Sequence, residues 1–213
     1  TGSGKTTIAG LVLRLHEPER GTIRLQDGLA LHQCDRAWIR SRIATVPQDV
    51  HLFAGTIADN LSLFGSAPSE RLVAAAATVH ADTLIARLPD GLDHRLGERG
   101  GTLSSGERQL LALARAVACD PELLILDEAT AHLDSHSESL VQDGITRLLA
   151  GRSALIIAHR LSTIRTCNRI LVLHHGQLAE QGTHAELLAA GGLYADLHRR
   201  FEAEAAVEAT TAL

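Results

Sequence analysis

The chain opens with a short run of residues that could bind phosphate. In order, these residues are Gly2, Ser3, Gly4, Lys5, Thr6 and Thr7. Glycines let the backbone turn tightly enough for several N–H groups to converge on one anion, and a following helix adds the positive end of its dipole. Lys5 would then reach the β- and γ-phosphates of a nucleotide, and the Thr6 hydroxyl would be a ligand of Mg²⁺. Taken alone, the run could also be a Gly/Ser turn beside a solvated lysine.

Two adjacent carboxylates follow a strongly apolar run later in the chain. Leu123–Leu126 is apolar on both faces, as in a strand buried in a parallel sheet, and Asp127 and Glu128 come directly after it. The C-terminal edge of such a sheet is where α/β proteins form their sites. We expect Asp127 to hold the metal shell through water, and Glu128 to polarise an attacking water as general base. The run by itself is also compatible with a strand that ends in a solvated acidic turn.

A second loop rich in serine and glycine, Gly101–Gln109, stands just before a helical stretch. It offers another helix N-terminus that suits phosphate. One chain with two such helix ends suggests that each nucleotide is held between two copies. On its own, the loop could also be an ordinary Ser/Gly cap.

These residues need a scaffold, and the pattern of the chain predicts an α/β fold in which short apolar runs alternate with helical stretches. The strand-like runs are Thr22–Leu25, Ile43–Val46, Glu122–Leu126, Ala154–Ile157, Arg169–Leu173 and Gln177–Glu180. The helical stretches are Thr6–Leu15, Pro68–Val79, Ala81–Leu88, Gly106–Cys119 and Ser135–Leu149. Residues 49–119 carry little strand signal, so we expect a helical subdomain there, inserted into a mainly parallel sheet flanked by helices.

Composition narrows the class of protein. Of the 213 residues, 45% are apolar and the formal net charge is −5, which describes a folded globular chain and not a basic nucleic-acid binder. The three cysteines are isolated, so we expect a reducing cytosolic setting without a disulfide framework. No apolar run reaches the roughly 18 residues that span a bilayer, and there is no signal peptide. We therefore expect any membrane-spanning part in another chain or in an upstream segment.

Six motifs in order make the chain resemble the ATP-binding cassette domain of ABC transporters over nearly its whole length. They are the later part of Walker A in Gly2–Thr7, the Q-loop at Gln48, the signature at Leu103–Glu107, Walker B at Leu123–Glu128, the D-loop at Ala131–Asp134 and the H-loop at His159. The resemblance implies a P-loop NTPase-like fold, ATP and Mg²⁺ as ligands, and head-to-tail pairing with a second cassette, identical or different.

The resemblance also assigns the site residues. Its catalytic residues are Glu128, His159 and Gln48. Its nucleotide-binding residues are Gly2, Ser3, Gly4, Lys5, Thr6, Thr7, Ser104, Gly106 and Asp134. Its metal ligands are Thr6, Gln48 and Asp127. Ser104 and Gly106 would reach the γ-phosphate from the partner cassette, and hydrolysis would then separate the two cassettes.

Three further stretches are similar to those of exporter cassettes, namely Phe53–Asn60, Gly97–Gly100 and Ile157–Ile164. In exporters the glutamate before the signature, here Glu98, couples the cassette to transmembrane helices that precede it on the same polypeptide. We therefore expect residues 1–213 to be a cassette fragment that begins partway through its phosphate loop and belongs with a transmembrane domain. Its expected location is the cytoplasmic face of the plasma (inner) membrane. The transported substrate cannot be inferred from these residues.

The chain departs from the family pattern at three positions. Ser105 replaces the usual second glycine of the signature, Glu107 replaces the usual glutamine, and His132 replaces a small D-loop residue. Because Ser104 and Gly106 remain, we expect the function of the signature to be altered and not lost. The aromatic residue that stacks on adenine is expected upstream.

Two other interpretations stay open. One is an ABC-type ATPase of DNA repair or chromosome maintenance, although residues 49–103 leave no room for the coiled coils or zinc modules of those proteins, and nucleic acid is not an expected partner. The other is a binding or structural piece that is inactive by itself.

Overall fold

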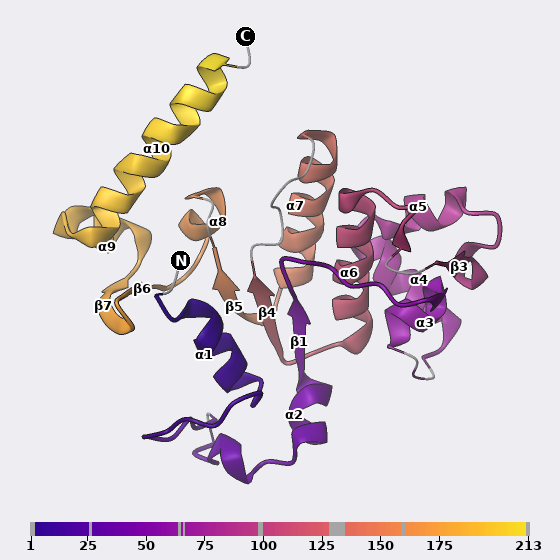
Figure 1. Ribbon diagram of the computed structural model, residues 1–213, viewed down its shortest axis with the longest axis horizontal. Coiled ribbons are helices and arrows are strands. Elements are labelled where there is room, and N and C mark those ends of the chain that lie inside the picture. The colour runs from indigo at the N-terminus through magenta and orange to yellow at the C-terminus, as the bar shows by residue number, and fades with distance from the viewer. Residues whose placement is uncertain are drawn as a thin grey trace. The chain divides into compact units, whose positions relative to one another are not determined.

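The computed structural model describes residues 3–25, 27–63, 65, 67–97, 100–127, 135–158 and 161–211 (Figure 1). The chain divides into two compact units. The small unit holds Thr1–Leu11 together with Ile157–Leu213, and the large unit holds Val12–Ile156. Each unit has a hydrophobic cluster of its own.

The large unit is built around a three-stranded sheet in the order β1-β4-β5. Its strands are β1 (Ile43–Val46), β4 (Leu123–Asp127) and β5 (Ser153–Ile157). β1 and β4 run parallel, in a register that pairs Val46 with Leu126, and Figure 1 shows all three arrows pointing the same way. Residues 124–126 are at most 2% exposed, so β4 is covered on both faces, as predicted for a strand in a parallel sheet.

Helices of the large unit pack on this sheet and on one another. They are α2 (Arg36–Arg42), α3 (Ile57–Ser62), α4 (Ser69–Thr78), α5 (Ala81–Arg87), α6 (Ser105–Cys119) and α7 (Ser135–Leu149), with the 3₁₀ turns η1 (Leu31–Gln33) and η2 (Gly91–Asp93). The central helix is α6, which contacts α3, α4, α5, α7 and β1. Its residues 110–114 are at most 5% exposed, so α6 is buried nearly all round. This arrangement confirms the predicted α/β fold.

The predicted helical subdomain at residues 49–119 contains α3 to α6. Its described residues also form two very short strands, β2 (Gly55–Thr56) and β3 (Arg95–Leu96), which pair antiparallel. A single hydrophobic cluster includes these helices together with β1, β4 and α7. The boundaries at residues 49 and 119 therefore remain a prediction.

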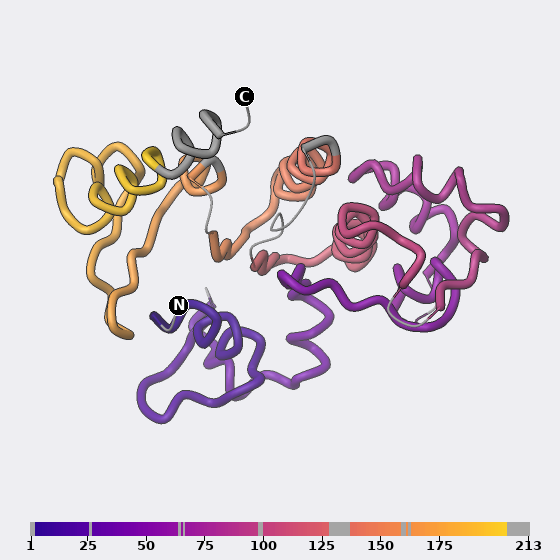
Figure 2. Tube along the Cα trace, turned by 45° about the horizontal axis from the view of Figure 1, so that its top comes forward, coloured from indigo at the N-terminus to yellow at the C-terminus, as the bar shows by residue number. Residues whose placement is uncertain are grey.

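The small unit combines a hairpin with helices. Its elements are α1 (Lys5–Val12), α8 (Leu161–Arg165), β6 (Ile170–His174), β7 (Gln177–Gly182), α9 (His184–Ala190) and α10 (Leu193–Thr211). β6 and β7 are antiparallel, and the turn residues His175 and Gly176 both have positive φ, as a two-residue hairpin of the I′ type requires. Val172, Leu187 and Tyr194 join the hairpin to the two last helices, and Figure 2 follows the trace from the hairpin into them.

The prediction of a strand at Thr22–Leu25 is wrong. The segment makes only an isolated antiparallel bridge, between Arg24 and Ala30. The Gly28 N–H donates to the Leu25 carbonyl at 2.9 Å, and Gly28 has φ +84. The described residues on either side of this turn therefore make a bridge and not a ladder.

Candidate functional site

The phosphate loop predicted at the start of the chain leads directly into α1. Lys5 is the first residue of this helix, and the Ile8 N–H donates to the Gly4 carbonyl at 3.1 Å. Gly4 has φ +95, a conformation that glycine adopts and that strains other residues. Lys5 Nζ donates to Ser3 Oγ at 3.4 Å, so the ammonium turns back toward the loop. Gly2 lies outside the described residues.

The first turn of α1 is open to a ligand. Thr6 and Thr7 are exposed, whereas Ala9 and Gly10 are buried. The N–H groups that open a helix have no partner inside it, and they carry the positive end of the helix dipole. Together with Lys5, this turn therefore offers hydrogen-bond donors and positive charge to an anion.

Asp127 lies at the carboxyl end of a strand of the parallel sheet, as predicted. It is the last residue of β4, and its neighbour Leu126 pairs with Val46, the last residue of β1. Because β1 and β4 are parallel, the chain leaves both strands at the same edge. Gln48, which follows Val46 by two residues, is exposed, and Asp127 is half-buried. The structure therefore brings two predicted oxygen donors, Gln48 and Asp127, to one edge of the sheet.

Several predicted residues fall outside the part of the chain that the structure describes. They are Glu98, Glu128, Asp134 and His159. Along the sequence, Glu128 is the next residue after β4 and His159 the second after β5. The roles assigned to these four residues remain predictions.

The second predicted helix start is the N-terminus of α6. Ser104 is its N-cap: Ser104 Oγ accepts from the Glu107 N–H at 3.2 Å, and the Ser104 N–H donates to Glu107 Oε2 at 2.8 Å. This reciprocal pair is a capping box, and such N-caps contribute about 0.5–2 kcal/mol to stability. Burial raises the pKa of the Glu107 carboxyl, but the Ser104 N–H and the Arg87 guanidinium together hold that pKa below its ordinary value. Glu107 is therefore ionised at neutral pH.

Gly106 lies buried where α6 meets α7. A Cβ at this position would come within 2.5 Å of Ser137 Cβ, a distance that real Cβ atoms essentially never show. The predicted signature glycine therefore has a packing role, because it lets the starts of two helices approach closely. Its contact with a γ-phosphate remains a prediction.

The segment that follows Gln48 is tied to α6 by a contact that the sequence analysis did not predict. Arg115 of α6 donates to the carbonyls of His51 at 3.2 Å and of Asn60 at 2.8 Å. Asn60 is fully buried, and its amide exchanges hydrogen bonds with the Phe53 backbone at 2.8 and 2.9 Å. Because Arg115 and Asn60 are 55 residues apart, no local pattern could have indicated this pair.

The same segment adjoins the chain that precedes the signature. β2 belongs to this segment and pairs antiparallel with β3, which stands shortly before the signature in the sequence. Gly100 lies so close to Leu52 that a Cβ would come within 2.8 Å of Leu52 Cδ1. The chain within and just before Phe53–Asn60 therefore neighbours β3 and Gly100 in the fold.

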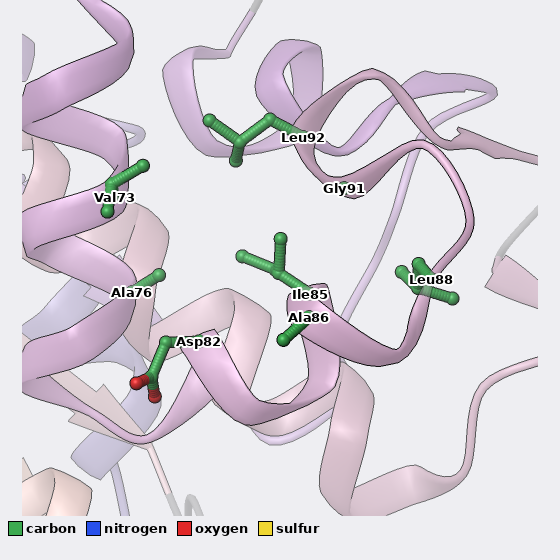
Figure 3. Close-up of a pocket in the computed structure, with 8 residues that line it drawn as sticks. All are labelled: Val73, Ala76, Asp82, Ile85, Ala86, Leu88, Gly91 and Leu92. Carbon is green, nitrogen blue, oxygen red and sulfur yellow. The ribbon is translucent and has the colours of Figure 1, made fainter.

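A pocket of about 240 Å³ lies between α4, α5 and η2 (Figure 3). Figure 3 shows Val73 and Ala76 of α4 facing Ile85 of α5 and Leu92 of η2. The charged residue in this lining is Asp82, an acid. An apolar lining with a carboxylate offers nothing to hold phosphate, so the pocket does not belong to the predicted site.

In sequence and fold, the chain is similar to parts of known transporters. A family model described as ABC transporter matches residues 1–131. An ATP-dependent lipid A-core flippase of Burkholderia orbicola is 50% identical over 200 residues, and the uncharacterized ABC transporter ATP-binding protein YknV of Bacillus subtilis is 47% identical over 199 residues. A bacterial Atm1-family ABC exporter solved with ATP bound is 41% identical, with a TM-score of 0.85.

These matches cover nearly all of this chain and a minor part of each larger protein. The flippase match takes 93% of this chain and 33% of the flippase, the YknV match 92% and 33%, and the exporter match 94% and 35%. The chain thus spans about a third of the length of the curated relatives it matches. Among the described residues, no helix has the length and apolar character to cross a bilayer. With the family model over more than half of its length, the chain belongs to the ABC transporter family.

Proposed function

We propose that this chain is an ATP-binding and ATP-hydrolysing cassette that powers export of a substrate across a membrane. Two cassettes would pair head to tail, with MgATP between the Lys5 loop of one and the Ser104 loop of the other. The observation that carries the proposal is the position of Gln48 and Asp127 at one edge of a parallel sheet, with Glu128 next in the sequence. The family and its ATP-bound exporter structure support it.

The chemistry of the side chains suits a nucleotide with Mg²⁺. Lys5 and the first turn of α1 supply charge and donors for the β- and γ-phosphates. The Thr6 hydroxyl, the Gln48 amide oxygen and the Asp127 carboxylate are the hard oxygen donors that Mg²⁺ prefers. Bound Mg²⁺ would neutralise charge that develops on the phosphates during transfer. The donor set of this chain therefore fits the expected metal.

Hydrolysis requires an oriented water molecule and a base. Glu128 would accept the proton of the attacking water, while His159 and Gln48 would position and sense the γ-phosphate. From the partner cassette, Ser104 and Gly106 would present a second helix N-terminus to the same phosphate. The product would lose the γ-phosphate that joins the two copies, so the cassettes would separate.

The separation of the cassettes is proposed to move a transmembrane domain that precedes this chain on the same polypeptide. Arg115 ties the segment after Gln48 to α6, the helix that begins at the signature. A displacement of the α6 start would therefore reach that segment, which together with Glu98 is proposed to contact the membrane part. The cassette would then lie at the cytoplasmic face of the plasma (inner) membrane.

Lys5 allows a direct test, because it is the only lysine in the chain. Acetic anhydride would acetylate this amine, and mass spectrometry of the peptide that contains Lys5 would give the rate. With MgATP at about ten times its Kd, we expect acetylation to slow about tenfold, since a bound triphosphate would contact the Lys5 ammonium and shield it from the reagent. MgAMP, which lacks the β- and γ-phosphates, should not protect. Equal rates with and without MgATP would contradict the proposal.

A further inference from the structure

The N-terminus of α6 carries a negative charge for which the proposed function gives no role. Glu107 is the third residue of the helix, and its Oε2 accepts from the Ser104 N–H at 2.8 Å. Ser104 is the residue proposed to meet the γ-phosphate of the partner's nucleotide. A triphosphate that approaches this helix end therefore meets a fixed carboxylate, which weakens the favourable effect of the helix dipole.

Arg87 contacts the Glu107 carboxylate. It stands in the last turn of α5, 20 residues earlier in the sequence, and its Nη2 donates to Glu107 Oε1, the oxygen that the capping box does not use. The two oxygens of one carboxylate are thus divided between the N-cap of α6 and a guanidinium. The Arg87 side chain is 66% exposed and that of Glu107 is 24% exposed, so the cation lies on the solvent side of the pair. The pair restores neutrality at the helix end.

We propose that Arg87 is a positioning residue for the second phosphate-binding loop and acts through Glu107 on Ser104. It holds the Glu107 carboxylate in the geometry that caps α6, and it offsets the charge of that carboxylate where a triphosphate must bind. The inference rests on the proposed function, in which Ser104 of one cassette receives the γ-phosphate bound by the other.

Substitutions can separate the charge of Glu107 from its capping role. In the full chain, Arg87→Ala leaves the carboxylate uncompensated, and we expect the KM for ATP to rise about two- to fivefold, the range that an exposed ion pair supports. Glu107→Gln keeps an oxygen for the Ser104 N–H and removes the charge. The double variant R87A/E107Q should therefore return to the KM of E107Q alone, which is expected at or below that of the wild type.

A matched control and a salt series distinguish this role from a merely structural one. Arg147→Ala breaks another exposed ion pair of the large unit, with Asp143 at 2.7 Å, and should leave the KM unchanged. The KM defect of R87A should shrink as the salt concentration rises from about 0.05 to 0.5 M, because salt screens the repulsion between the uncompensated carboxylate and the triphosphate. Loss of packing alone would not follow ionic strength. Protection of Lys5 from acetylation by MgATP should be the same in R87A and in the wild type, because Lys5 belongs to the other loop.

The outcomes divide clearly. A wild-type KM in R87A, a defect that E107Q does not relieve, or a defect that salt does not reduce would overturn the role of Arg87 and leave the proposed function intact. A wild-type chain that neither hydrolyses ATP nor shows protection of Lys5 would overturn the proposed function, and the role of Arg87 with it.

Discussion

Glycine at position 106 lets α6 and α7 begin side by side. The residue is buried, and a Cβ would lie within 2.5 Å of Ser137 Cβ and 2.8 Å of Ser137 Oγ. Any larger residue must push the helix starts apart. Because Ser104 caps the same turn of α6, such a shift would also move the hydroxyl that we propose to meet a phosphate.

Gly106→Ala is expected to lower the free energy of unfolding by about 1–3 kcal/mol, the typical effect of one extra carbon in a packed site. Urea denaturation followed by far-UV circular dichroism would measure it. Gly97→Ala is the matched control, since its Cβ would meet nothing within 4 Å and its φ is not positive. The control should change stability by less than about 0.5 kcal/mol. Equal stability of the two variants would contradict the close contact at Gly106.

Much of the candidate site is predictable from residue types and spacing. The loop before α1 and the acid at the end of β4 follow from local patterns, and the structure has a helix that begins at Lys5 and a strand that ends at Asp127. Their roles toward phosphate and metal stay predictions. Ser104 and Glu107 have the spacing of a capping box, so even this detail is encoded locally. The contact of Arg87 with Glu107 is not, because it depends on how α5 packs against α6.

Among the elements, α3 and α6 are held together by buried polar groups as well as by apolar packing. Asn60 is 0% exposed, and its side chain bonds the backbone of Phe53 and the carbonyl of Thr56. Arg115 of α6 then binds the Asn60 carbonyl at 2.8 Å. Burial lowers the pKa of the Arg115 guanidinium. Such a network is stable only when every member keeps its partner.

Asn60→Ala should therefore destabilise the large unit strongly. The substitution leaves the Phe53 N–H and the carbonyls of Phe53 and Thr56 without their side-chain partner, and we expect a loss of about 2–3 kcal/mol. The same urea titration measures it. The other asparagine of the chain, Asn168, is exposed, and Asn168→Ala serves as the control. If both variants unfold at the same urea concentration, the network does not stabilise the fold.

The elements that sequence predicts well are those with a long or unmixed pattern. α7 has the predicted bounds Ser135–Leu149, and β1 has the predicted bounds Ile43–Val46. α2, α3 and α9 were not predicted, because helices of six or seven residues are too short for a helical period to stand out. α10 was not predicted either, although it is 19 residues long. The register between β1 and β4 and the division into two units arise from contacts between distant residues, which one sequence does not reveal.

At the scale of the whole molecule, we propose that this chain is one part of a larger transporter. It belongs to the ABC transporter family and spans about a third of its curated relatives. The proposed division of labour gives ATP chemistry to this part and leaves the choice of substrate to a transmembrane domain. A defect at the predicted base should therefore abolish ATP hydrolysis while ATP binding is kept.

Glu128→Gln is the variant that isolates this step. It removes the carboxylate proposed to accept the proton of the attacking water, and it leaves the Lys5 loop untouched. In the full chain, steady-state release of phosphate should fall by about 100-fold or more, the contribution of a general base, while MgATP protects Lys5 from acetylation as in the wild type. Phosphate release by Glu128→Gln at the wild-type rate would contradict the assignment of Glu128 and the hydrolytic mechanism built on it.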